Sequence, residues 1–439
     1  MIDAGKLRDR LREIVSPNRG AQPRAAASVE AAPPSSLEAA LGGAWRGSTF
    51  IIERESSADV RYGEQTVGDI AEGLRCAVQE AVLLTGRADA APQFLFFDLE
   101  TTGLNGGAGT YAFLVGSAWF DNQGAFRTRQ YLLCRGGDEV ALLAAVESGL
   151  AESGTLVTFN GKSFDAPLLE TRCLFHRRDW FGSRLPHLDV LHPARQLWGD
   201  PSTGCSLTQL ERQLLGVRRA GDLPGFEAPA RYFQFIRSGD ASLLAAVVEH
   251  NRADMLALAA VTARLFALVR RGPCAALTPR EALGLGRLYA RTGRHDEALA
   301  AFERAVALMD GGAPAFLAAE ALRALALAYR RLRRYDAAAA CWQRLLNRGC
   351  DGAARREACE ALAIHHEHRV RDLAAARTFA LRSLESAPRE RWEDAVRHRL
   401  ARIERKQGAV SAPPLFPSSP SWPSPPSSGL QRSGRRISS

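Results

Sequence analysis

The sequence has 439 residues, of which 46% are hydrophobic, and a formal net charge of +9. This length suits two or three domains, and the hydrophobic content excludes a chain that is disordered throughout. No apolar segment approaches the roughly 18 to 20 residues of a membrane span. The start, MIDAGKLRDRLREIV, lacks the apolar core of a signal peptide. The positive charge suits a polyanionic partner such as nucleic acid without assigning one.

The eight cysteines form no CxxC pair and show no zinc-type spacing. Such a set is typical of reduced thiols in the cytosol. We therefore expect a cytoplasmic protein with mostly buried thiols and no membrane association.

The amino-terminal part of the chain divides into two regions. Residues 1–38 predict a short amphipathic helix over 2–14 and then a flexible linker rich in Pro, Ala and Ser. Residues 39–91 form an extension in which the alternation over 45–63 predicts a hairpin or two short strands. Apolar residues at helical spacing predict one helix over 67–87.

The central region, residues 92–270, predicts an α/β domain. Its first strand is followed by strands over 111–120 and 125–134, joined by short turns. A helix over 138–153 and a strand over 155–160 come next. Consecutive strands followed by alternating helix and strand indicate a mixed sheet with helices on its faces.

The first strand of this region runs into two acids. Phe94 to Phe97 form an apolar run of strand length that leads directly to Asp98, Leu99 and Glu100. Asp98 and Glu100 share one face of the strand because residues two apart point the same way. Two neighbouring buried carboxylates repel, and a divalent cation makes such a pair tolerable. The alternative is a strand end at which both acids meet water.

Two further acids lie at element junctions or on helices. Ser163 is a candidate helix cap, which places Asp165 in the first turn, where a carboxylate also stabilises the helix dipole. His250 and Asp254 are four residues apart on a long helix over 243–268 and are neighbours on one face. A single pair of that kind is also consistent with a surface contact.

Two other groups of residues each have two possible interpretations. Asp189 with His187 and His192 is a mixed cluster that suits either a metal or packing at a helix start. After a short helix ending at Gly216, cations and aromatics mix in a segment that either grips nucleic acid or forms an ordinary amphipathic helix. The members of that segment are Arg218, Arg219, Arg231, Tyr232, Phe233 and Phe235.

Residues 278–406 contain helical repeats with a period of about 40 residues. The first two units keep the spacing of tetratricopeptide repeats, and a third is weaker. Its turn, HHEHRVRD (365–372), suits a solvated loop better than a metal site. A helix over 392–406 caps the stack, and residues 407–439 are rich in Pro and Ser, which predicts disorder. The matching positions are Ala282, Leu285, Gly286, Tyr289, Ala298, Phe302 and Ala305, then Leu322, Leu325, Ala326, Tyr329, Ala338, Trp342 and Leu345.

The order of the acids resembles a known pattern. DLETTGL, FNGKSFDAPLL and EHNRADMLAL resemble the three motifs of the DEDD exonuclease superfamily, over roughly residues 92–268. HLDVLHPARQLW, DLPGF and YFQF are similar to a bacterial subfamily of ribonuclease H-like proteins, some of which carry tetratricopeptide repeats. The resemblance implies an α/β ribonuclease H-like domain, a mixed sheet flanked by helices, followed by an all-α tetratricopeptide repeat domain.

The resemblance also implies a metal site. Asp98, Glu100, Asp165 and Asp254 would hold two Mg²⁺ or Mn²⁺ ions about 4 Å apart, with Asp98 bridging both. His250 would be the general base, because imidazole suits proton transfer near neutral pH. Family members with a histidine base place it five residues before the last Asp, and those with tyrosine four. His250 combines the histidine with the four-residue spacing.

Substrate contacts are expected near these acids. Thr101, Thr102, Asn160 and Lys162 adjoin the motifs, and Lys162 would contact the scissile phosphate unless it is merely exposed. We expect a metal-dependent 3′–5′ exonuclease acting on single-stranded DNA or RNA, with a protein partner at the repeats. The alternatives are a nucleic-acid- or protein-binding module with little catalysis and a structure-selective endonuclease of the same fold.

Overall fold

The computed structural model describes residues 37–103, 109–151, 153–200, 204–385 and 390–411. The chain splits into two compact units, Met1–Arg270 and Arg271–Ser439. The helix expected over 2–14, its linker up to residue 36 and the tail from 412 onward lie outside the described residues.

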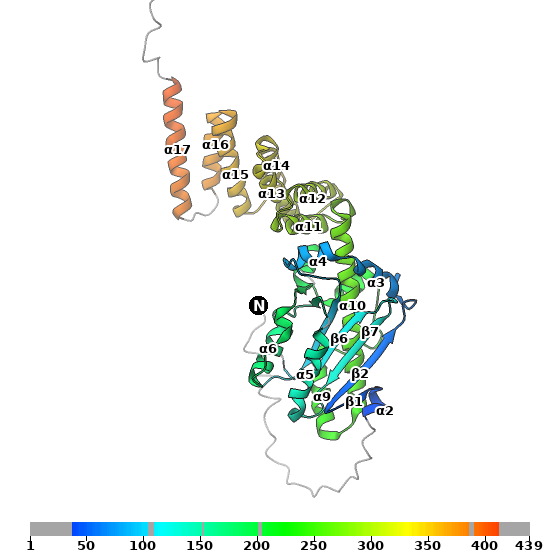
Figure 1. The fold of residues 1–439 in the computed structure, drawn as a ribbon. Coiled ribbons are helices and arrows are strands. Elements are labelled where there is room, and N and C mark those ends of the chain that lie inside the picture. The colour runs from blue at the N-terminus through cyan, green and yellow to red at the C-terminus, as the bar shows by residue number, and fades with distance from the viewer. Residues whose placement is uncertain (1–36, 104–108, 152, 201–203, 386–389, 412–439) are drawn as a thin grey trace, which may run out of the picture. The chain divides into compact units, whose positions relative to one another are not determined.

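The first unit is built on a seven-stranded sheet with the order β1-β2-β7-β6-β5-β8-β9 (Figure 1). Strands β8 and β9 run parallel to β5, and the other pairs are antiparallel. Strands β5, β6 and β7 form the expected meander, so the predicted mixed sheet is confirmed. The bounds are β1 Ala44–Arg46, β2 Thr49–Ser56, β5 Phe94–Thr101, β6 Ala112–Phe120, β7 Phe126–Leu132, β8 Thr155–Thr158 and β9 His187–Asp189; β3 Arg61–Tyr62 and β4 Gln65–Thr66 form a separate pair.

The alternation of β5 divides the core between the two faces of the sheet. Leu95, Phe97 and Leu99 belong to one apolar cluster with side chains of α5 (Glu139–Leu150) and α6 (Asp165–Phe175). On the other face, the ring of Phe94 packs 5.4 Å from that of Phe266 on α10 (Ala245–Arg271). Asp98 and Glu100, in register with Phe94, therefore face α10.

The extension before residue 92 differs from the prediction in one respect. The single helix expected over 67–87 is wrong, because the chain forms α3 (Val67–Arg75) and α4 (Val78–Thr85). Arg270 stabilises the break by donating to the Gly73 carbonyl at 3.2 Å and to Glu80 at 2.7 Å. The remaining helices of this unit are α2 Leu37–Leu41, α7 Leu191–Leu197, α8 Leu207–Leu215 and α9 Ala228–Ser238.

The second unit consists of helices in which successive elements pack together. Small residues allow this packing: a Cβ on Gly286 would lie 2.5 Å from the Phe302 ring. The last helix continues beyond the expected residue 406 to Ser411, because the first helix-breaking proline is at 413. The bounds are α11 Pro279–Arg291, α12 His295–Ala307, α13 Ala315–Arg331, α14 Tyr335–Arg348, α15 Gly352–His365, α16 Leu373–Leu384 and α17 Glu390–Ser411.

The turn expected as a solvated loop is instead a π-helical turn, His366–Val370, and contains a buried acid. The Glu367 carboxylate pairs with Arg402 at 2.7 Å, Lys406 at 2.8 Å and Arg399 at 3.3 Å, all from α17. The hydrogen bond from Arg402 lowers the pKa of Glu367 to about 2. One carboxylate thus joins α17 to the preceding repeat.

Replacing Glu367 with Gln should loosen α17. The substitution leaves three cations without their common partner. Because two of these cations reach water, we expect the free energy of unfolding to fall by about 2 kcal/mol. This is less than the loss expected when a fully buried ion pair is broken. Amide hydrogen exchange should accelerate along α17. Glu404→Gln is the control: it also lies on α17, but its 3.8 Å pair with Arg377 of α16 is exposed, so it should change exchange little. Equal exchange in both variants would contradict this role.

All eight cysteines are free thiols, but only Cys173, Cys341 and Cys359 are buried, so the expectation of mostly buried thiols is wrong. Within the part of the chain that the structure describes, no helix has both the length and the apolar character needed to cross a membrane.

Candidate active site

Asp98 is held by a chain of buried amides. Asn251 Nδ2 on α10 donates to Asp98 Oδ2 at 2.7 Å and to the Asp98 carbonyl at 3.3 Å. Gln130 Nε2 on β7 donates to Asn251 Oδ1 at 2.8 Å. This second bond fixes which end of the Asn251 amide faces Asp98. The sheet and α10 together therefore orient the carboxylate.

Space for Asn251 depends on a glycine. Gly116 of β6 lies opposite Asp98 in the strand register, and a Cβ there would lie 2.3 Å from Asn251 Oδ1. Met255 atoms would lie 2.9 Å away. Because Asn251 is fully buried and held at both ends, it has little freedom to move aside.

We expect Gly116→Ala to lower the unfolding free energy by about 1 to 3 kcal/mol, the usual effect of overpacking a core. Gly73→Ala in helix α3 is the matched control, since its Cβ would make an ordinary 3.6 Å contact with the Cβ of Ala263 on α10. That control should be neutral or slightly stabilising, because Ala favours helices over Gly. Thermal melts compare the two, and a Gly116→Ala protein as stable as the control would contradict the packing argument.

Three of the four predicted ligands carry raised pKa values. Burial raises the pKa of Asp98 well above its usual range, and the carboxylates of Asp254, Glu100 and Asp165 add to it. Burial likewise raises the pKa of Glu100 to about 8, despite the opposing effect of His250. Burial, assisted by Asp189, raises the pKa of Asp165 to about 7. The fold therefore brings the other three predicted acids within electrostatic reach of Asp98.

Asp189 shapes the loop that leads to Asp165. Its buried carboxylate accepts backbone N–H bonds from Asn160 at 2.8 Å and Lys162 at 3.1 Å. Asn160 adopts φ +69°, the left-handed conformation that Asn tolerates better than most residues. His192 lies 3.9 Å from Asp189, whereas His187 bonds to the Thr158 hydroxyl at 2.8 Å. These contacts favour packing at the helix start over the metal cluster.

His250 lies between two carboxylates. Its Nδ1 is 2.7 Å from Asp222 Oδ1 and its Nε2 is 3.6 Å from Asp254 Oδ2. Burial disfavours the imidazolium, but Asp254 and the hydrogen bond with Asp222 outweigh it and raise the pKa of His250 above 6.5. Arg219 Nη1 pairs with the other oxygen of Asp254 at 2.6 Å.

The predicted substrate contacts lie around the end of β5 and the loop after β8. The Thr101 hydroxyl donates to the Gly103 carbonyl at 3.0 Å, and the Thr102 hydroxyl accepts from the Tyr111 amide at 2.9 Å. Both hydroxyls thus stabilise the turn after the acids. Lys162 is exposed.

Four residues of the site were not assigned a role from the sequence. Asn251 and Asp254 are three residues apart on one helix face, which is a usable local signal. Arg219 stood out only as part of a mixed segment. Asp222 and Gln130 reach the site through contacts over 28 and 121 residues of sequence, respectively, and no local pattern marks them.

The donor set fits a divalent cation in chemistry and charge. Carboxylate oxygens are the ligands that Mg²⁺ and Mn²⁺ prefer. Glu100 is buried and Asp98 and Asp165 are half-buried, and none of the three has an ion-pair partner among the described residues. Within those residues, no three Asp, Glu, His or Cys side chains already converge tightly enough to hold an ion.

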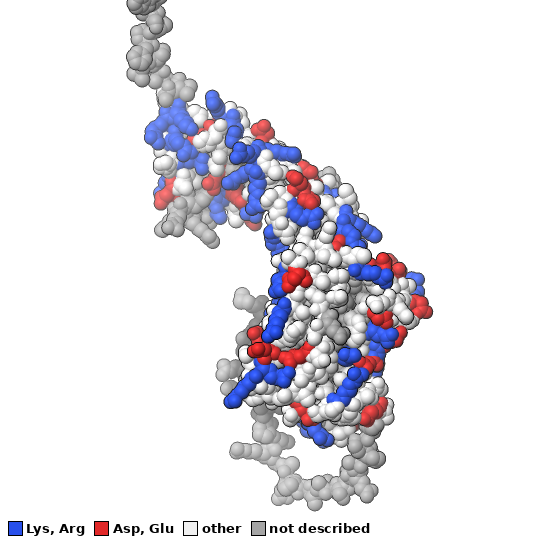
Figure 2. All heavy atoms as spheres, in the orientation of Figure 1, with Lys and Arg blue, Asp and Glu red and all other residues white. Residues whose placement is uncertain are grey.

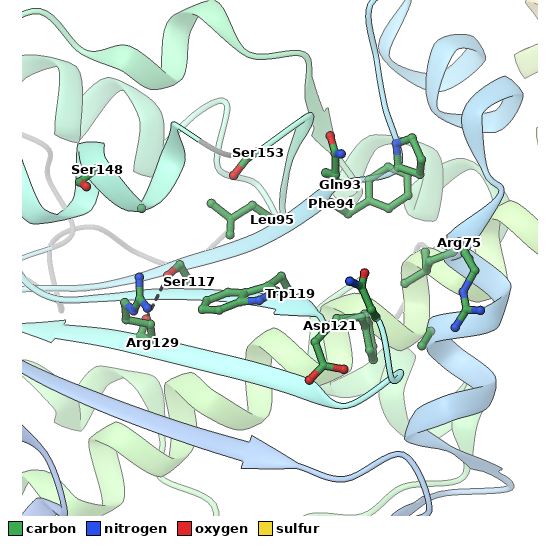
Figure 3. A pocket seen from close by; sticks show the side chains of 16 residues that line it. Arg75, Gln93, Phe94, Leu95, Ser117, Trp119, Asp121, Arg129, Ser148 and Ser153 are labelled. Atoms are coloured by element: carbon green, nitrogen blue, oxygen red, sulfur yellow. Dashed lines mark hydrogen bonds between the residues drawn. The ribbon is translucent and has the colours of Figure 1, made fainter.

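A hollow of about 590 Å³ adjoins the start of β5, at the end opposite to the acids (Figure 3). It is lined by Gln93, Phe94 and Leu95, and by Trp119 with the Arg129 guanidinium 5.3 Å from its ring. None of the four acids lines it. The acid cluster and this hollow are separate features of the sheet.

Comparison with known proteins agrees with this architecture. Residues 95–266 match the RNase_H superfamily, and residues 279–351 match the tetratricopeptide repeat. The chain is 33% identical over 367 residues to YprB of Bacillus subtilis (strain 168), described as an uncharacterized protein, with 81% of this chain and 86% of that protein covered. The chain therefore belongs to the RNase_H superfamily, in one family with the Bacillus subtilis protein, and carries tetratricopeptide repeats after the superfamily domain.

Proposed function

We propose that this protein is a metal-dependent nuclease, a 3′–5′ exonuclease that hydrolyses phosphodiester bonds of single-stranded DNA or RNA. Membership of the RNase_H superfamily supports a nuclease-type function and binding of nucleic acid. The observation that carries the proposal is the convergence of four carboxylates, in which burial and mutual repulsion raise the pKa values of Asp98, Glu100 and Asp165. Such a cluster is costly unless a cation binds it.

Asp98, Glu100, Asp165 and Asp254 would hold two divalent ions, Mg²⁺ or Mn²⁺. When bound, such ions activate water and stabilise the leaving oxygen of a phosphodiester. The Asn251 amide orients Asp98 for this role.

His250 is the proposed general base. Asp222 holds Nδ1, so Nε2 is the atom that exchanges a proton with the attacking water. This nitrogen lies 3.6 Å from the carboxylate of Asp254, one of the proposed ligands, four residues further along the helix. The repeats, as in other such arrays, are the proposed site for a protein partner.

End-labelled strands test the activity. Purified full-length protein with Mg²⁺ or Mn²⁺ should shorten 5′-labelled single-stranded DNA or RNA from the 3′ end in a ladder, and EDTA should stop it. Circular single-stranded DNA should stay intact. Cleavage of the circle would assign the endonuclease alternative instead. Tight binding without metal-dependent cleavage on any substrate would leave a binding module and refute the nuclease.

A further inference from the structure

Net charge does not by itself locate a substrate path on this protein. Figure 2 shows basic and acidic side chains interspersed over the visible face of the first unit. Most of the arginines near the acid cluster are already paired: Arg252 with Glu249 at 2.6 Å, for example, and Arg54 with the same carboxylate at 3.2 Å. The informative cations are therefore those with at least one donor that no acid engages.

Arg219 has one donor left over. Its side chain is only 9% exposed, with Nε bonded to Glu211 at 2.8 Å and Nη1 paired with Asp254 at 2.6 Å and Asp222 at 3.4 Å. Glu211 is itself buried and accepts a hydrogen bond from the Tyr62 hydroxyl. The remaining nitrogen, Nη2, is buried and has no hydrogen-bond partner among the residues that the structure describes. A buried guanidinium nitrogen without a partner is costly, and a bound acceptor would satisfy it.

The same arginine lines a hollow of about 820 Å³ at the surface. We call it the α8 groove, because its wall is formed by helix α8 and the loop that follows. Arg212 and Arg218 line it too, both exposed and, among the residues that the structure describes, without an ion-pair partner. The residues that matter here are Ser206, Thr208, Arg212, Arg218, Arg219 and Asp222.

The groove carries a surplus of positive charge. Three arginines line it against one acid, Asp222, whose carboxylate is already engaged by His250 and Arg219. The hydroxyls of Ser206 and Thr208 add donors, and Val217 is its sole aliphatic side chain. Walls of this kind suit a chain of phosphates better than an apolar ligand.

We propose that the α8 groove binds the phosphodiester backbone of the substrate strand beside the scissile bond, with the three arginines that line it facing the phosphates. This inference rests on the proposed nuclease function. Arg219 is the physical link, because one guanidinium contacts the metal-ligand candidate Asp254 and lines the groove. Arg212 and Arg218 contact the phosphates farther along the strand. Guanidinium groups match phosphate oxygens in a bidentate geometry, which gives the strand a defined register.

Binding without cleavage tests the groove. Fluorescence anisotropy of labelled single-stranded DNA and RNA in EDTA keeps the strand intact. In the full-length chain, Arg212→Glu combined with Arg218→Glu should raise Kd at least about tenfold. The slope of log Kd against log salt should fall by about 1.4, the value for two lost phosphate contacts to a single strand. The matched control is Arg177→Glu with Arg237→Glu, two exposed arginines without an acidic partner in the described chain that lie outside the groove.

The outcomes separate this inference from the function itself. Arg219 is left out of the main test because its replacement would remove the cation that pairs with Glu211 and Asp254 and would destabilise the fold. If the wild type cleaves but the double variant binds like its control, the groove is overturned and the nuclease stands. If the wild type binds with the expected salt slope and never cleaves, the nuclease fails. If a polyglutamate peptide displaces the strand as well as unlabelled DNA does, the groove is a site for acidic protein segments and the inference is overturned.

Discussion

Asp98→Asn is expected to abolish metal-dependent cleavage and at the same time to stabilise the metal-free protein. The first effect follows from losing a proposed ligand, and we expect activity to fall at least about 10²-fold. The second follows from electrostatics. Asp98 is half-buried beside Asp254, Glu100 and Asp165, and its desolvation together with these three carboxylates raises its pKa. A neutral side chain of the same shape removes this repulsion and can still accept a hydrogen bond from Asn251.

Calorimetry in EDTA should show Asp98→Asn melting above the wild type, by about 1 to 3 kcal/mol in unfolding free energy. Asp121→Asn is the control, and its effect on the unfolding free energy should have the opposite sign. Asp121 pairs with Arg127 at 2.9 Å and accepts two backbone N–H bonds, so its carboxylate stabilises the fold. That variant should lose stability and keep its cleavage rate. A variant at Asp98 that cleaves normally, or that melts below the wild type in EDTA, would remove the basis of the proposed metal site.

The stability of the metal-free first unit should fall as pH rises from about 5 to about 8, by a few kcal/mol. The folded pKa values of Asp165, about 7, and Glu100, about 8, lie above the ordinary values of 3.8 and 4.5. Over this interval the folded state keeps protons that the unfolded state has released, so stability is greatest at low pH and is lost as pH rises. Mg²⁺ or Mn²⁺ should cancel the decline, since a cation replaces the protons.

Calorimetric scans of the full chain at several pH values, with EDTA or with metal, measure this effect. The unfolding transition of the first unit is recognised as the one that Asp98→Asn shifts. The repeat unit is an internal control. Glu367 has its pKa lowered to about 2, so it contributes stability above about 4.5 that is lost as pH falls toward 2. Its transition should not decline between pH 5 and 8. A first unit whose stability is flat or rises over that range in EDTA would show that the acids do not repel as the structure implies.

Local patterns in the sequence were sufficient for the framework of this protein. The alternation of Phe94 to Glu100 predicts both the strand and the shared face of its two acids, because side chains on a strand repeat every two residues. The spacing of Gly286, Phe302 and their counterparts predicts paired helices, because each pair buries its small residues against the next. The order of Asp98, Asp165 and Asp254 carries a resemblance that implies a ribonuclease H-like domain, and the match to the RNase_H superfamily confirms that domain.

Only the tertiary structure decided which groups these acids meet. Asn251 contacts Asp98 across 153 residues of sequence, and Tyr62 reaches Glu211 across 149. His250 pairs with Asp222, and Asp254 pairs with Arg219, because the loop after α8 packs against α10. Hydrogen bonds and ion pairs act over a few ångströms in space and leave no period along the chain. The sequence therefore determined the strand, the repeats and the acids, whereas packing determined the amides, the cations and the groove around them.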